Sequence, residues 1–156
     1  MALFNVRVYG LLFDEKKRLL VSDEFIRGNY FTKLPGGGLE FGEGTRDCLK
    51  REFMEETGLT VEVAEHIYTT DFFQISAFNN KDQIISIYYR VIANDLSQLE
   101  TKTKPFDLAP HQVADPNGES EVFRWIECDK LCEEDMSLPI DKVVIGLVND
   151  QLRISN

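Results

Sequence analysis

The chain has 156 residues, a formal net charge of −10 and a pI of about 4.7. Such an acidic surface repels nucleic-acid backbones, which bind basic patches, so we expect no nucleic-acid partner. Hydrophobic residues make up 43% and charged residues 28%, which is typical of a globular chain and excludes a disordered one. The length predicts a single domain covering residues 1–156.

The sequence also bears on location and on its thiols. No apolar run reaches the roughly 18 residues that span a bilayer, and the N-terminus MALFNVRVYG lacks the pattern of an export signal. We therefore expect a cytoplasmic protein with no membrane partner. Cys48, Cys128 and Cys132 are expected to be reduced thiols. The spacing of the last two invites a zinc site, but only His66 and His111 remain as further ligands, which argues against it.

The order of β-branched and aromatic segments predicts several strands. These strands cover residues 3–13, 18–25, 59–68, 71–78, 83–94 and 121–127. We expect the first two to form a hairpin, and a turn at residues 79–82 to join an antiparallel pair. Residues 96–120 form a long, proline-containing connection of the kind that often carries function.

Helices are expected between and after the strands. The first runs to Thr57 with Thr45 as its N-cap, and Gly58 follows it in the left-handed conformation. A short helix is expected near residues 129–133, and a longer amphipathic one at residues 140–152. The inward face of the longer helix is expected to hold Val143, Val144, Leu147 and Val148. This order predicts an α/β (α+β) fold, in which a mixed β-sheet packs between helical layers.

Residues 34–59 combine two features that a purely structural segment avoids. Consecutive glycines, here 36–38, lose the most conformational freedom on folding. Glu52, Glu55 and Glu56 share one helical face, where like charges repel by a few tenths of a kcal/mol per pair. A solvated acidic face, with Arg51 paired to Glu55, is one explanation. The other is a site for Mg²⁺, which prefers oxygen ligands and often shares them with substrate phosphates.

The wider pattern favours the second explanation. The chain carries Gly37, Glu43, Arg51-Glu52-Phe53, Glu55-Glu56 and Gly58-Leu59. This series closely resembles the signature of the Nudix hydrolase family, G-x5-E-x7-R-E-U-x-E-E-x-G-U, where U is a bulky apolar residue. Every position of the signature agrees. The strand and helix order elsewhere is similar to the α/β/α sandwich of that family.

The resemblance implies a metal site and a reaction. It implies that Mg²⁺ (or Mn²⁺) is held by the carbonyl of Gly36 and by Glu52, Glu55 and Glu56, and that Arg51 pairs with Glu43 or orients a ligand carboxylate. The implied reaction is hydrolysis of the pyrophosphate bond in a nucleoside diphosphate linked to another moiety, in which a metal-activated water attacks phosphorus. The partner is thus a small-molecule nucleotide. Many members of the family are homodimers, so a homodimer is a further expectation; the number of metal ions stays open.

The catalytic base and the substrate contacts are less constrained. In the family the base is the glutamate after the box arginine, here Glu52, or a glutamate in a later loop. Glu119 and Glu121 are candidates for the second location, and Glu119 is preferred because mobility of the loop could bring it to the metal. Glu55 completes the expected catalytic set.

For the substrate, Arg27 is the expected phosphate contact, with Arg7 and Lys33 as further cations. Phe31, Phe72, Phe73 and Tyr9 are the aromatic side chains considered for stacking on a base, and the sequence does not choose among them.

The substrate within the class stays open. The positions at which relatives carry markers for ADP-ribose and for dinucleoside polyphosphates hold Phe73 and Ile75 here, and a coenzyme A motif is not evident upstream. Two rival functions remain. One is a Nudix-fold sensor that binds a nucleotide derivative without useful turnover, although such members often lose a box glutamate. The other is a plain divalent-cation surface, which would not need the glycine run.

Overall fold

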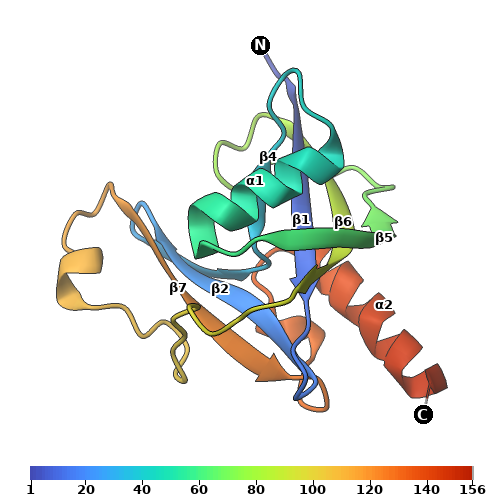
Figure 1. Cartoon of the computed structure of the whole chain (residues 1–156). Coiled ribbons are helices and arrows are strands. Elements are labelled where there is room, and N and C mark those ends of the chain that lie inside the picture. Colours follow the sequence, from blue (N-terminus) through green and yellow to red (C-terminus); the bar gives the residue numbers. More distant parts are fainter. Residues whose placement is uncertain (156) are drawn as a thin grey trace. The chain divides into compact units, whose positions relative to one another are not determined.

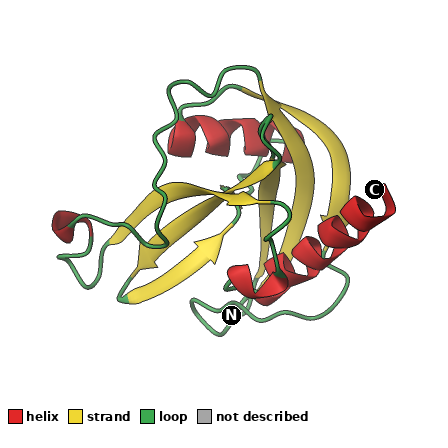
Figure 2. Cartoon of the chain, turned by 90° about the horizontal axis from the view of Figure 1, so that it is seen from below, coloured by secondary structure: helices red, strands yellow, loops and turns green. Residues whose placement is uncertain are grey.

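The computed structural model describes residues 1–155, with side chains to residue 151. It divides into two compact units, each built from separate stretches of chain. Unit 1 comprises Met1–Leu12 and Pro35–Leu99; unit 2 comprises Phe13–Leu34 and the chain from Glu100 onward. Figure 1 labels the elements, and Figure 2 distinguishes helices, strands and loops by colour. Within the described residues, each unit contains one β-sheet and one long helix.

Unit 1 is built on a four-stranded mixed sheet in the order β4-β1-β6-β5. Its strands are β1 (Phe4–Leu12), β4 (Gly36–Gly38), β5 (Val61–Thr69) and β6 (Gln83–Ala93). β1 runs parallel to β6 and antiparallel to β4, while β5 and β6 are antiparallel. The glycine run is therefore an edge strand of this sheet.

Helix α1 (Thr45–Thr57) belongs to unit 1 and packs on this sheet through a narrow apolar face, formed by Cys48, Leu49 and Phe53. The ring of Phe53 lies so close to Gly10 of β1 that a Cβ on Gly10 would come within 2.6 Å of it. The glycine in β1 thus gives the ring its place on the sheet.

Polar contacts fasten the first turn of α1 to the same sheet. The Arg46 guanidinium lies over the Tyr89 ring at 4.7 Å and donates to the carbonyls of Val63 and Ala64 at 2.8 Å each. The register of β5 shifts after Val63, so Arg46 bonds carbonyls at the edge of an irregular ladder. Together these contacts set the position of α1 along the sheet.

One of the two expected caps of α1 is present in the structure. The N-cap is Gly44, which has no side chain to offer, so the prediction of Thr45 as the cap is wrong. Thr45 is the first helical residue, and its hydroxyl instead bonds the Tyr89 hydroxyl at 2.7 Å. Gly58 is confirmed as the C-terminal residue in the left-handed region, with φ 74°, and its N–H bonds the carbonyl of Met54.

Unit 2 is built on an antiparallel sheet in the order β3-β2-β7. Its strands are β2 (Arg18–Ile26), β3 (Asn29–Lys33) and β7 (Glu119–Glu127). Asp23 of β2 is fully buried and accepts bonds from Arg124 at 2.7 and 3.0 Å and from the Thr32 hydroxyl at 2.7 Å. It also accepts from the N–H of Phe106 at 3.2 Å, which ties the long connection to the sheet.

Helix α2 (Pro139–Ser155) begins with a proline, as first helical positions often do, and two short 3₁₀ turns precede it. These turns are η1 (Pro110–Gln112) and η2 (Glu133–Asp135), so the helix expected at residues 129–133 is replaced by a turn placed slightly later. Only part of the predicted inward face of α2 is correct. Val144 and Val148 are buried together with Ile140 and Ile145, while Val143 and Leu147 are exposed. Among the described residues, no helix has the length and apolarity to cross a membrane.

Two expected strand pairings form only as isolated bridges. The first and second strands meet only in an isolated antiparallel bridge between Phe13 and Leu19 across the expected turn. Beyond it, β1 pairs with β4 and β6, whereas β2 pairs with β3 and β7. Residues 71–78 form no strand and make only an isolated bridge between Ile75 and Gln83. There the Ser76 hydroxyl accepts bonds from the N–H groups of Phe78 and Asn79, and such local bonds compete with a β-ladder.

Candidate functional site

The glycine strand β4 gives Glu52 its place. An ideal Cβ on Gly37 would lie 2.5 Å from the Glu52 carboxyl carbon, so this carboxylate lies directly against the strand. At Gly36, φ is +148° and a Cβ would come within 2.1 Å of the carbonyl oxygen of Val8. The backbone of β1 therefore excludes a side chain at Gly36, whereas a side chain at Gly37 would displace the Glu52 carboxylate.

Two carbonyl groups of β4 face away from β1. In an antiparallel ladder, alternate residues exchange hydrogen bonds with the partner strand, and the residues between them do not. Here Gly10 donates to the carbonyl of Pro35 and Leu39 donates to that of Val6, both at 2.9 Å. By this alternation the carbonyls of Gly36 and Gly38 point to the other side. The carbonyl of Gly38 indeed accepts a bond from Arg51 Nη2 at 3.1 Å.

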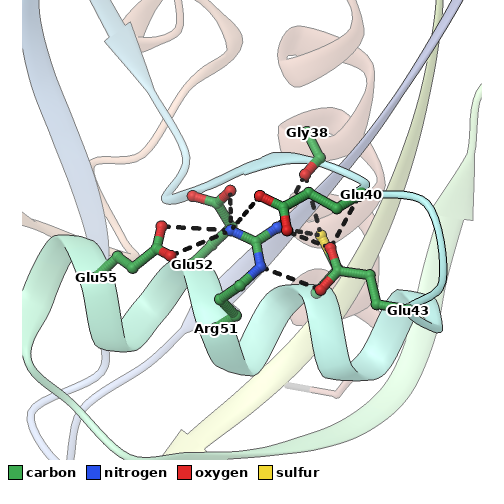
Figure 3. Close-up of polar contacts among 7 residues, drawn as sticks. Gly38, Glu40, Glu43, Arg51, Glu52 and Glu55 are labelled. Atoms are coloured by element: carbon green, nitrogen blue, oxygen red, sulfur yellow. Dashed lines mark hydrogen bonds and ion pairs between the residues drawn. The ribbon is translucent and has the colours of Figure 1, made fainter.

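Arg51 of α1 is the centre of the polar network next to this strand (Figure 3). It binds Glu43 with two bonds, from Nε at 3.0 Å and from Nη2 at 2.7 Å. Its Nη1 lies 3.0 Å from Glu52 and 3.3 Å from Glu55. The two-bond geometry fixes the guanidinium plane against Glu43, and the remaining nitrogen is directed at the two helix carboxylates.

The charges in this network do not balance. Glu40 also lies 3.7 Å from Arg51 Nη1, so four carboxylates surround one guanidinium and leave a formal charge of −3. Glu56 follows Glu52 by one helical turn and is half-buried. An excess of oxygen donors at one end of a helix face, next to backbone carbonyls, is the donor set that a hard cation prefers.

No metal centre is preassembled in the part of the chain that the structure describes, in the sense that no three His, Cys, Asp or Glu side chains are arranged to hold an ion. The contacts of Arg51 account for this, because its Nη1 bonds Glu52 and Glu55. Glu55 is 59% exposed and free to rotate away from Arg51, whereas Glu52 is 14% exposed. The residues thus fit a cation site that forms when Glu55 turns, with Glu52 already in place.

Comparison with known proteins decides the family. A family model described as the NUDIX domain matches residues 3–145. The chain belongs to the Nudix family. The match extends over both units and far beyond the box at residues 37–59, and it confirms the resemblance on which the site was predicted.

Solved structures agree on the Nudix fold. The E. coli ORF135 protein superposes with a TM-score of 0.68 at 14% identity, over 99% of this chain and 94% of its own. A Nudix hydrolase from Nitrosomonas europaea gives 0.63 at 20% identity, with 94% and 89% covered. An ADP-ribose pyrophosphatase from Streptococcus suis gives 0.58 at 16% identity, with 96% and 92% covered. At such identities the likeness establishes the fold, and the expected mixed α/β architecture is confirmed.

Two Nudix-site residues were not anticipated from the sequence. Glu40 bonds Glu43 through its backbone N–H at 2.9 Å and approaches Arg51 through its carboxylate. Cys48 is fully buried, and its thiol lies 3.5 Å from the carbonyl of Gly38. Burial first, and then the hydrogen bond to Glu43, raise the pKa of Cys48 to about 12, so it stays a neutral thiol. The sequence signal that could have identified Glu40 and Cys48 as site residues was their position between Gly37 and Arg51.

Two predicted site residues outside the box, Arg27 and Glu119, lie in unit 2. Arg27 occupies the turn between β2 and β3 with φ 46°, is exposed, and donates its N–H to the carbonyl of Gly118 at 3.0 Å. Glu119 is the first residue of β7 and pairs with Ile26, so its expected place in a loop is wrong. The structure brings Arg27 and Glu119 together at one end of this sheet. Their roles at the glutamates of unit 1 stay predictions.

The other cations and aromatic side chains considered for substrate contacts are divided between unit 1 and unit 2. Arg7 donates to the Tyr9 hydroxyl at 2.6 Å, and Tyr9 is buried, so its ring is not an open stacking surface. Lys33 is buried and lies 3.5 Å from Glu24. Phe73 is 67% exposed, which leaves it as an accessible aromatic side chain.

Glu43 gives the network a measurable pH dependence. The hydrogen bonds from Arg51 first, and then from the Glu40 backbone, lower the pKa of Glu43 from 4.5 to about 2. A lowered folded-state pKa means that ionised Glu43 stabilises the fold above about pH 4.5 and that this contribution is lost as the pH falls toward 2. We expect Glu43→Gln to reduce the free energy of unfolding at neutral pH, by an amount that shrinks below pH 4.5.

Denaturant unfolding of wild type and Glu43→Gln, from neutral pH to about pH 3, measures this difference. Glu62→Gln, a change of an exposed carboxylate on β5, is the matched control and should track wild type. A difference that stays constant with pH would show that Glu43 does not act through its ionised form.

Proposed function

We propose that this chain hydrolyses the pyrophosphate bond of a nucleoside diphosphate linked to another moiety, with Mg²⁺ or Mn²⁺ as cofactor. Family membership indicates a hydrolase acting on phosphoanhydride bonds. The observation that carries the finer proposal is the carboxylate network around Arg51, held against the side-chain-free strand β4. That the Streptococcus suis protein of similar fold is an ADP-ribose pyrophosphatase supports a nucleoside diphosphate derivative as the substrate class.

The proposed ligands of the cation are the carbonyl of Gly36 and the carboxylates of Glu52, Glu55 and Glu56. When bound, the cation supplies positive charge to phosphate oxygens and acidifies a water molecule. Arg51 holds Glu43 with two bonds and the carbonyl of Gly38 with a third. Arg51 therefore stays anchored when Glu55 turns away, and it continues to orient Glu52 through the 3.0 Å contact.

The proton of the attacking water needs an acceptor. Glu52 is our first assignment, because its position against Gly37 is fixed by packing and by Arg51. Glu119 is the second assignment, as an exposed carboxylate at the start of β7. Arg27, next to it, is assigned to a phosphate of the substrate.

The test is a hydrolysis screen of ADP-ribose, other nucleoside diphosphate derivatives and nucleoside triphosphates, with Mg²⁺ or Mn²⁺ and with chelator. We expect one class to be cleaved only with metal, and Glu52→Gln and Glu56→Gln each to lower kcat about 100-fold or more. Glu62→Gln on β5 is the control that removes a carboxylate outside the network. Chromatography of the products identifies the phosphorus that was attacked.

The same screen separates the alternatives. Loss of activity in Glu119→Gln comparable to that in Glu52→Gln would assign the base to β7, and a raised KM in Arg27→Ala would support its phosphate contact. If no compound is cleaved but one raises the melting temperature, the chain is a sensor and the proposed catalysis is contradicted.

The glycine strand allows a closely matched pair of variants. In Gly37→Ala the new Cβ would lie 2.5 Å from the Glu52 carboxyl carbon, and because that carboxylate ends a flexible side chain it must move. In Gly38→Ala the nearest atom is 3.6 Å away, an ordinary contact. We expect Gly37→Ala to lose about 100-fold in kcat/KM, since a misplacement of about 1 Å can cost that much, and to stay folded.

Gly38→Ala is expected to retain activity within a few-fold of wild type. Melting temperatures of both variants show whether the fold survives. Equal activities of Gly37→Ala and Gly38→Ala would contradict the importance of the Glu52 position.

A further inference from the structure

Unit 2 contains a pocket of about 390 Å³ beside β7 and the segment at residues 101–103. This volume lies within the range of small-molecule sites. The residues that line it include Arg18, Lys102, Arg124, Trp125, Lys130 and Glu127. All of these residues belong to unit 2, and none is part of the Nudix box or of the contacts assigned above.

The residues that line this pocket are more basic than the chain as a whole. Four cations and one carboxylate line the pocket, although the chain carries 17 basic and 27 acidic residues and a net charge of −10. A concentration of cations in a concave site on an acidic protein attracts small anions, because low-dielectric walls focus the field.

The four cations differ in how firmly they are paired. Arg124 is bound with two bonds to the fully buried Asp23, and Arg18 is bound to Asp14, a carboxylate that is 7% exposed. Both arginines are thus fixed in place by carboxylates behind the wall.

The two lysines are paired at the surface only. Lys102 lies 3.7 Å from Glu100, which is 86% exposed, and Lys130 lies 2.8 Å from Glu127, with both partners of this pair more than half exposed. Exposed pairs of this kind contribute little, so an incoming anion can replace either carboxylate.

The pocket also offers an aromatic surface at a fixed position. The Arg18 guanidinium lies over the ring of Trp125 at 5.3 Å, and the tryptophan is half-buried. The backbone holds Lys102 beside β7. Its N–H donates to the carbonyl of Phe123 at 2.7 Å, and the residue pairs with Arg124 in an isolated parallel β-bridge. Alternation along β7 places Trp125 on the sheet face of Arg18, and Arg124 with its bridge partner Lys102 on the other face, so a ligand that contacts both groups lies across the sheet edge. Cations and an indole ring at one edge suit a phosphate group attached to a planar base.

We propose that this pocket binds a small phosphate-bearing anion, with Lys102 and Lys130 contacting the phosphate and Trp125 contacting an attached base. The ligand is a nucleotide or free phosphate, which share the phosphate chemistry. The site does not depend on the glutamates of α1, so it holds whether or not the chain is a hydrolase.

The sequence provides a direct reporter, because Trp125 is the one tryptophan of the chain. We would titrate the full chain with AMP, inorganic phosphate and adenosine and follow tryptophan fluorescence, with chelator present so that metal-dependent turnover is blocked. We expect a saturable change with AMP that weakens as salt is added. Saturation by phosphate alone would identify the phosphate as sufficient, whereas AMP binding without phosphate binding would show that the base is also needed.

The lysines are tested by variants. Lys102→Ala with Lys130→Ala is expected to weaken AMP binding at least tenfold, while Lys104→Ala, the same charge change at an exposed lysine outside the wall, leaves it unchanged. Lys102→Gln with Lys130→Gln repeats the test with longer polar side chains if the alanine variant folds poorly. No saturable change with AMP or phosphate, equal binding of adenosine and AMP, or equal weakening by Lys104→Ala would each overturn the proposal.

Discussion

The two-bond contact between Arg51 and Glu43 is the interaction on which the arrangement of the site depends. It joins the loop after β4 to α1, and it directs the remaining guanidinium nitrogen at Glu52 and Glu55. Without it, three carboxylates of one helix face would repel each other and adopt separate rotamers. With it, Glu52 is held against Gly37 and only Glu55 is left exposed.

The fold supplies the surroundings that this contact needs. Gly10 admits the Phe53 ring and thereby sets the distance of α1 from β1, while Arg46 and Thr45 fix its first turn on β5 and β6. Because Gly36 has no side chain, β4 can pack closely against the backbone of β1. The carbonyls of Gly36 and Gly38 then face away from β1. Gly10, Gly36 and Gly37 each leave space for a particular contact, which explains why these strand positions lack a side chain.

The sequence predicted the helix that carries the box and only part of the fold. The box helix, its C-terminal limit and the left-handed Gly58 follow from local patterns, because helix periodicity and a C-terminal glycine act over a few residues. The pairing of β1 with β6 and of β2 with β7 is non-local, and no local signal opposes the simpler hairpin. Strands β3 and β4 are short, and a run of three glycines has no strand propensity, so they could not be predicted.

The misses within the site have the same origin. Thr45 has the residue type of a cap, but the nearby Tyr89 hydroxyl from β6 takes its side chain, and Gly44 becomes the cap. Glu119 was expected in a loop, but the register of β7 with Ile26 extends the strand to it. In both cases a contact distant in sequence overrides a local preference.

We propose that the carboxylates around Arg51 form a cation site and not a self-contained ion-pair network. Electron paramagnetic resonance of free Mn²⁺, titrated into the protein without substrate, tests it most directly. We expect the wild-type chain to remove Mn²⁺ from solution, Glu52→Gln and Glu56→Gln to remove much less, and Glu62→Gln to behave as wild type. Equal Mn²⁺ binding by all four proteins would contradict it.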